Sequence, residues 1–119
     1  MSAVLDTHTV LWYLENSKEL SAVARATVED AVRDARHVRV SAISLGTALE
    51  RLRSALTDPS SGMLIAPVDA GVADALPNIP RDIVPDMPDR IIAATALYLG
   101  LPLVTRDRRL QAAGIQTVW

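Results

Sequence analysis

The sequence contains no cysteine, a single lysine and no long apolar run. The lack of cysteine excludes disulfide bonds and thiolate metal sites. A membrane-spanning helix needs roughly 18 or more consecutive apolar residues, so none is expected here. Met1 and Ser2 lead directly into an apolar run without a basic segment or cleavage site, and we therefore expect no export signal. These absences favour a cytoplasmic protein.

The charged residues are nearly balanced, and the formal net charge is −2. This balance argues against a chain that coats nucleic acid through bulk electrostatics. Eleven of the twelve basic residues are arginine, which favours forked contacts to phosphate or carboxylate. A bias in genomic base composition explains the same excess, so both interpretations stay open. At 119 residues the chain is long enough for one core, and we expect a single domain over residues 1–119.

Short apolar runs alternate with segments of helical periodicity. Ser21 is a predicted helix N-cap, and Gly100 is a predicted helix stop. The alternation predicts an α/β fold with a parallel sheet and right-handed crossovers. Strands are predicted over residues 3–5, 38–41, 63–67, 101–104 and 115–119, and helices over 10–14, 22–35, 45–56, 70–76, 89–99 and 108–113.

Asp6 lies where the first predicted strand ends and helical spacing begins. In open α/β sheets, ligands bind at the carboxyl ends of the strands. A buried strand end is a poor place for a lone charge, so other groups are expected to converge on Asp6. The candidates are Asp89, which opens the predicted helix before the fourth strand, Asp86, three residues earlier, and Asp107, which follows the fourth strand.

Carboxylates brought close together repel one another unless a cation neutralises them. A hard divalent ion such as Mg²⁺ or Mn²⁺ suits an all-oxygen cluster. Simpler roles are also open. Asp86 and Asp89 fit a capped helix start with proline in the first turn, and Asp107 could act only on the dipole of the last helix.

We expect mainly structural roles for the histidines and the large aromatic residues. His8 is expected to bond local backbone, with a ligand role as the alternative, and His37 is expected at the surface. Trp12, Tyr13 and Trp119 are expected in the core or in a dimer contact rather than in a base-stacking platform.

Four segments occur in an order typical of one family. Each segment alone is a weak signal, and the match extends over nearly the whole chain. The segments are VLDT at 4–7, SAISL at 41–45, DMPDRIIAATA at 86–96 and TRD at 105–107. In series they closely resemble the PIN-domain ribonucleases, especially the VapC-like toxins of bacterial toxin–antitoxin pairs.

The resemblance implies a three-layer α/β/α fold with a five-stranded parallel sheet in the order 3-2-1-4-5. In that order the first and fourth strands are neighbours. It also implies an endoribonuclease that depends on Mg²⁺ or Mn²⁺ and hydrolyses RNA phosphodiesters with a metal-activated water. The implied partners are an RNA substrate, a small antitoxin protein and a second copy of the chain in a homodimer.

By position, the resemblance identifies Asp6, Asp89 and Asp107 with the family's catalytic, metal-binding aspartates. Asp86 matches a further acid beside the metal, and Thr105 matches a hydroxyl residue before the last aspartate. Supporting oxygens are expected from Thr7, Thr47 and Glu50. Contacts to RNA phosphates are expected from Arg90, Arg106 and Arg108, with a solvated face or pairing to the acids as the alternative.

The chain departs from the family pattern in two places. The family usually has a glutamate two residues after the leucine of the second segment, where this chain has Thr47. Glu50 is expected on the same helix face, about 4–5 Å farther along the axis. The segment between Leu56 and Met63 is also shorter than in relatives. These departures motivate an alternative function, a catalytically weakened domain that binds RNA or the antitoxin without turnover.

Overall fold

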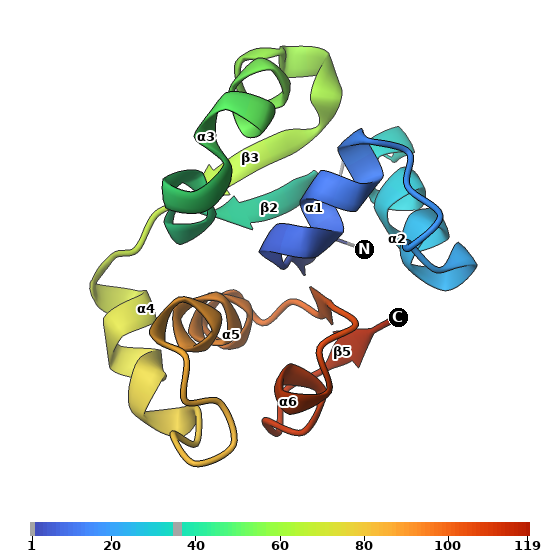
Figure 1. Ribbon diagram of the computed structural model, residues 1–119. Helices are drawn as coiled ribbons and strands as arrows, with labels where there is room; N and C mark the ends of the chain where they lie inside the picture. The colour runs from blue at the N-terminus through green and yellow to red at the C-terminus, as the bar shows by residue number, and fades with distance from the viewer. Residues whose placement is uncertain (1, 35–36) are drawn as a thin grey trace.

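The computed structural model describes residues 2–34 and 37–119, except for the side chains of residues 47–49 and 51. Its centre is a five-stranded, all-parallel sheet in the order β3-β2-β1-β4-β5 (Figure 1). This order confirms the one implied by the resemblance. The strands are β1 (Ala3–Leu5), β2 (Val38–Ser41), β3 (Met63–Ala66), β4 (Leu103–Val104) and β5 (Thr117–Val118).

Helices cover both faces of the sheet and produce three layers (Figure 1). Successive strand residues point to opposite faces, so Leu5 joins one apolar cluster and Val4 joins the other. The first cluster includes side chains of α1 (Thr7–Leu14), α2 (Ala22–Arg33) and α3 (Ala42–Thr57). The second includes side chains of α4 (Ala70–Ala75), α5 (Met87–Leu99) and α6 (Arg108–Gln111).

β1 lies in the middle of the sheet, with β2 on one side and β4 on the other. Leu5 is paired with Val40 of β2 and with Val104 of β4. The residues that follow these strands therefore emerge at the same edge. This register places Asp6 beside Thr105 at the end of β4.

Side-chain caps determine where several helices begin. The hydroxyl of Ser21 accepts a bond from the Ala24 amide, as predicted. The hydroxyl of Ser41 accepts a bond from the Ile43 amide, so α3 begins directly after β2 and not at the predicted Leu45. α1 likewise begins at Thr7 instead of Val10, because Asp6 caps it.

Other boundaries differ from the prediction by a few residues. β4 is shorter at its start because the Leu101 amide bonds the Ala96 carbonyl and completes the end of α5. Gly100 ends α5 with a φ of 66°, as predicted. Leu99, the last residue of α5, is 37% exposed. α6 ends at Gln111, before the predicted end at Ala113.

The connections add two short 3-10 helices, η1 (Pro59–Ser61) and η2 (Leu76–Asn78). α2 is described to Arg33, and the predicted end of this helix at Ala35 falls outside the described residues. Within the part of the chain that the structure describes, no helix has the length and apolar character needed to cross a membrane.

Candidate active site

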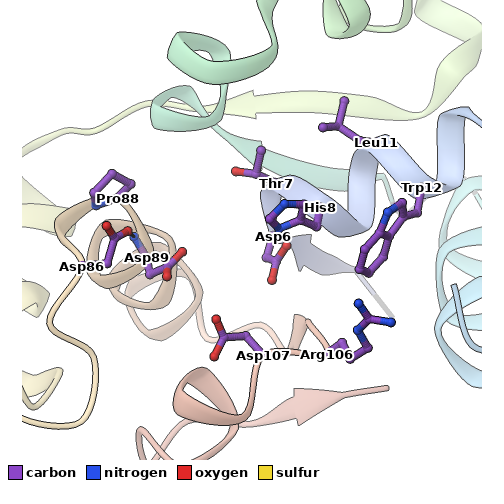
Figure 2. Close-up of a pocket in the computed structure, with 10 residues that line it drawn as sticks. All are labelled: Asp6, Thr7, His8, Leu11, Trp12, Asp86, Pro88, Asp89, Arg106 and Asp107. Carbon is purple, nitrogen blue, oxygen red and sulfur yellow. Dashed lines mark hydrogen bonds between the residues drawn. The ribbon is translucent and has the colours of Figure 1, made fainter. Parts of the chain in front are cut away.

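A cavity of about 560 Å³ opens at the carboxyl ends of β1 and β4 (Figure 2). Acidic side chains from three separate segments line it together with aromatic and apolar groups. The structure therefore brings together the four acids that the sequence pointed to. The lining residues are Asp6, Thr7, His8, Leu11, Trp12, Asp86, Pro88, Asp89, Arg106 and Asp107.

Asp6 is buried, with 7% of its surface exposed, and both its carboxylate oxygens accept hydrogen bonds. Oδ1 accepts a bond from the Thr9 amide at 3.2 Å. Oδ2 accepts a bond from the hydroxyl of Thr105, which lies at the end of the neighbouring strand. These two bonds satisfy a buried charge and fix the direction of the carboxylate.

Thr105 also connects Asp6 to Asp107. The Thr105 hydroxyl oxygen accepts a bond from the Asp107 amide at 3.0 Å while it donates to Asp6. The Asp107 carboxylate in turn accepts bonds from the amides of Arg109 at 2.8 Å and Leu110 at 3.4 Å. Asp107 therefore caps α6, a closer contact with this helix than the dipole interaction offered as its simpler role, and the same side chain also lines the cavity.

Asp86 caps α5 by accepting a bond from the Asp89 amide at 3.1 Å. This confirms the structural alternative for Asp86 without removing the residue from the cavity. Asp89 lies in the first turn of α5 with its carboxylate toward the cavity (Figure 2). Partial burial raises the pKa of Asp89 to about 6, and the negative charges of Asp86, Asp107 and Asp6 add to this effect.

The amino-terminal ends of helices α1, α5 and α6 are capped by Asp6, Asp86 and Asp107, respectively. The amino-terminal ends of helices carry partial positive charge, which favours nearby carboxylates. This arrangement favours an acidic cavity whose carboxylates, among the described residues, have no salt bridge to a basic side chain. The pKa of Asp89 is nevertheless raised, first by burial and then by the charges of the neighbouring acids.

The donors at this cavity are carboxylate and hydroxyl oxygens, which suit a hard divalent cation. Among the described residues, no three histidine or acidic side chains form a group that could hold a metal ion as they stand. Mg²⁺ commonly binds through one or two carboxylates and retains several waters. The four acids therefore fit such an ion if water completes its ligand shell.

The other wall of the cavity is aromatic. The rings of His8 and Trp12 are stacked, with centroids 5.5 Å apart and planes at 29°. The guanidinium carbon of Arg106 lies 4.4 Å from the Trp12 ring centroid. Arg106 Nη1 also donates to Glu19 at 2.6 Å, so part of its predicted alternative, pairing with an acid, is observed, although the acid lies outside the cavity lining.

Sequence reasoning gave His8 and Trp12 structural roles and therefore missed their place in the cavity. Trp12 does pack against the first apolar cluster, as expected, but it also lines the cavity. The available signal was their spacing. Residues four apart on a helix share one face, and His8 begins that face two residues after Asp6.

The structure contradicts the predicted phosphate contact of Arg90. Its side chain is buried, with 5% exposed, and Nη2 donates to the carbonyls of Leu76 and Ile79. Arg90 therefore joins the start of α5 to the segment around η2. A guanidinium committed to backbone carbonyls inside the protein has no access to RNA.

Of the remaining predicted site residues, one lines the cavity and the others do not or are not described. Thr7 lines the cavity, and its hydroxyl shares a 2.8 Å hydrogen bond with Ser44 of α3. Glu50 is exposed on α3 and is not among the described residues that line the cavity. The side chain of Thr47 lies outside the described part of the structure. Arg108 is exposed on α6, outside the described cavity lining.

Comparisons with known proteins identify the family and the fold. The model of the PIN domain family matches residues 3–116. Ribonuclease VapC22 of Mycobacterium tuberculosis is 33% identical to the chain over 125 residues, covering 93% of this chain and 91% of that protein.

Two solved complexes show the same fold. The chain matches VapBC2 of Rickettsia felis bound to a promoter DNA fragment with a TM-score of 0.68 and 12% identity, covering 98% of this chain and 97% of that one. It matches DNA-bound VapBC of Salmonella typhimurium with a TM-score of 0.66 and 18% identity, covering 98% and 96%.

Proposed function

Since the chain belongs to the PIN domain family, we propose that it is an endoribonuclease that depends on Mg²⁺ or Mn²⁺ and serves as the toxin of a toxin–antitoxin pair. The observation that carries the proposal is the convergence of Asp6, Asp86, Asp89 and Asp107 on one cavity. The relative named a ribonuclease covers nearly the whole chain, which supports the same activity.

In this proposal Asp6, Asp89 and Asp107 hold the cation directly or through water, with Asp86 beside them. When bound, a divalent ion supplies an activated water and neutralises charge on the scissile phosphate. The raised pKa of Asp89, caused mainly by burial and then by the other acids, supports a cation at this position. A cation would relieve the repulsion that raises it.

The protein's own groups orient this chemistry. Thr105 fixes the Asp6 carboxylate through its hydroxyl and is itself fixed by the Asp107 amide. Arg106 is the basic side chain in the cavity lining, and it is proposed to contact a flanking phosphate on release from Glu19. The exposed Arg108 remains a proposed phosphate contact farther from the acids.

Cleavage of RNA with Mn²⁺, measured for the wild type and for Asp6→Asn, tests the proposal. The wild type is expected to cleave and Asp6→Asn to lose activity by at least about a hundredfold, the scale on which single groups that stabilise a transition state act. Asp74→Asn is a matched control, because Asp74 is an exposed acid on α4 outside the described cavity lining. Equal cleavage by wild type and Asp6→Asn would place the active site elsewhere.

A binding module without turnover is the second candidate. The finding that no described group of three acids or histidines could hold a metal ion favours it, as does Thr47 in place of the usual glutamate. In that case RNA or an antitoxin binds, yet no RNA is cleaved at any Mn²⁺ concentration. The substitution Thr47→Glu, followed by a measurement of Mn²⁺ affinity, tests whether position 47 belongs to the site.

The proposed protein partner is a small antitoxin, because the structural relatives are VapBC assemblies. A homodimer is also proposed. Strand β3 lies at an edge of the sheet, and its Leu64 and Ile65 are 38% and 45% exposed. Light scattering on the purified chain measures its mass directly. A monomer at micromolar concentration would contradict the dimer proposal.

A further inference from the structure

The cavity has two chemically different walls (Figure 2). Asp86, Asp89 and Asp107 lie to one side of Asp6 and Trp12 lies to the other, with the His8 ring between them beside Asp6. The proposed catalytic chemistry uses the acidic wall and leaves the aromatic wall without a role. We propose that the aromatic wall is a nucleobase subsite, in which an unpaired RNA base stacks on His8. This inference rests on the proposed function.

His8 is an exposed ring held in a defined orientation. It belongs to the first turn of α1, and its side chain is exposed although the ring stacks on Trp12 at 5.5 Å. Trp12 is in turn held by the edge of Trp119, with centroids 5.9 Å apart, and by the first apolar cluster. A flat ring with a fixed backing and an accessible side is the surface that a nucleobase stacks on.

Electrostatics favour stacking as the source of affinity at this place. Four carboxylates line the cavity, and they repel the phosphates of RNA unless a cation intervenes. An uncharged base surface avoids this repulsion. Each base stacked on an aromatic ring typically improves affinity by about tenfold, and this gain does not depend on positive charge.

The order of the residues along the aromatic wall indicates whether single-stranded or double-stranded RNA can bind. His8 and Trp12 are four residues apart on α1, and Arg106 closes the far end over Trp12. A strand that follows this wall has one base on His8 and an adjoining phosphate toward Arg106. Bases in a duplex are paired and stacked on one another, so they are not available to His8. The subsite therefore selects single-stranded RNA.

Binding to the full-length Asp89→Asn chain in Mg²⁺ tests the inference without cleavage. The probes are a short single-stranded RNA and the same RNA with abasic positions. We expect the intact RNA to bind about tenfold more tightly and to shift the His8 ring proton signal in NMR spectra. The chain has two histidines, so His37, which lies before β2, serves as an internal reference.

Variants separate a contact role from a structural one. His8→Ala is expected to abolish the difference between intact and abasic RNA, and His8→Phe to restore it. His37→Asn is the matched control, because asparagine tolerates the positive φ of 55° at that position. Equal affinity for both RNAs, an unchanged ratio in His8→Ala, or a His8 shift that inorganic phosphate reproduces would each overturn the subsite.

This test and the cleavage test can fail separately. Base-dependent binding in a protein that cleaves no RNA would refute the nuclease and retain the subsite. Cleavage that depends on Asp6 but shows no base-dependent binding would refute the subsite and retain the nuclease.

Discussion

The carboxylate of Asp89 provides a quantitative prediction for the substitution Asp89→Asn in metal-free protein. Burial and three neighbouring acids raise its pKa from 3.8 to about 6. Ionised Asp89 therefore destabilises the folded state. A shift of this size corresponds to about 3 kcal/mol, and solvent screening at this partly exposed site reduces it to about 1 kcal/mol.

The sign of the pH dependence follows from proton binding. Between about pH 4 and pH 6 the folded state holds the Asp89 proton more often than the unfolded state does, so the free energy of unfolding falls as pH rises. Above pH 6 Asp89 is ionised in the folded state, and its full destabilising effect on the folded state is present. The substitution Asp89→Asn removes a charge that exists only above this range. It is expected to stabilise the protein at pH 8 and to have little effect at pH 4.

Thermal unfolding followed by circular dichroism in EDTA measures this effect. At about 2.1 cal/mol/K per residue, a chain of 119 residues gains roughly 4 °C in Tm for each 1 kcal/mol. Asp89→Asn is therefore expected to unfold about 4 °C higher at pH 8, and Asp74→Asn within about 1 °C of wild type. If Asp89→Asn were unchanged or less stable at pH 8, the acids would not be coupled as described.

Adding Mn²⁺ is expected to reverse the order of the Tm values of the wild type and Asp89→Asn. A ligand at ten times its Kd stabilises the folded state by about 1.4 kcal/mol, or roughly 6 °C for this chain. The wild type is expected to show this rise and Asp89→Asn a rise of less than about 2 °C, so that the wild type then unfolds at the higher temperature. A rise of the same size in both proteins would mean that Asp89 takes no part in binding the ion.

Three further substitutions test individual contacts. Thr105→Val leaves one oxygen of buried Asp6 without its donor and is expected to lower the free energy of unfolding by about 1–3 kcal/mol, measured in urea, with Thr105→Ser close to wild type. Arg90→Met removes the guanidinium donor of the buried Ile79 carbonyl and one of two donors to the Leu76 carbonyl, which also accepts the Ile79 amide. It is expected to cost about 1–3 kcal/mol, whereas Arg90 as an RNA contact would change RNA affinity without changing stability. Glu19→Gln frees Arg106 from an exposed pair. It is expected to change stability by less than about 1 kcal/mol and to tighten RNA binding, and weaker binding would contradict the proposed role of Arg106.

Much of the fold could be predicted because local signals and topology agree. Alternating apolar runs and helical segments indicated a parallel sheet, and the resemblance implied its observed order. Asp6 was recognised because a charge at a buried strand end requires partners, and the structure supplies them in Thr9 and Thr105. The capping role of Asp86 also followed from local sequence, whereas for Asp107 only an interaction with the helix dipole was expected and the structure shows a cap.

Contacts between segments distant in the chain could not be predicted from the sequence. Arginine is usually exposed, and nothing local indicates that Arg90 is buried against carbonyls 14 and 11 residues earlier. The aromatic wall depends on Trp12 meeting Arg106 from the far end of the chain. A helix pattern shows that Trp12 and His8 share a face, but it does not show that this face borders the acids.

A crystal soaked in Mn²⁺ and measured at the manganese absorption edge tests the central claim most directly. The account predicts an anomalous peak in the cavity, in contact with oxygens of Asp6, Asp89 or Asp107 or with waters bound to them. No peak there at millimolar Mn²⁺, or a peak only at another surface, would contradict it.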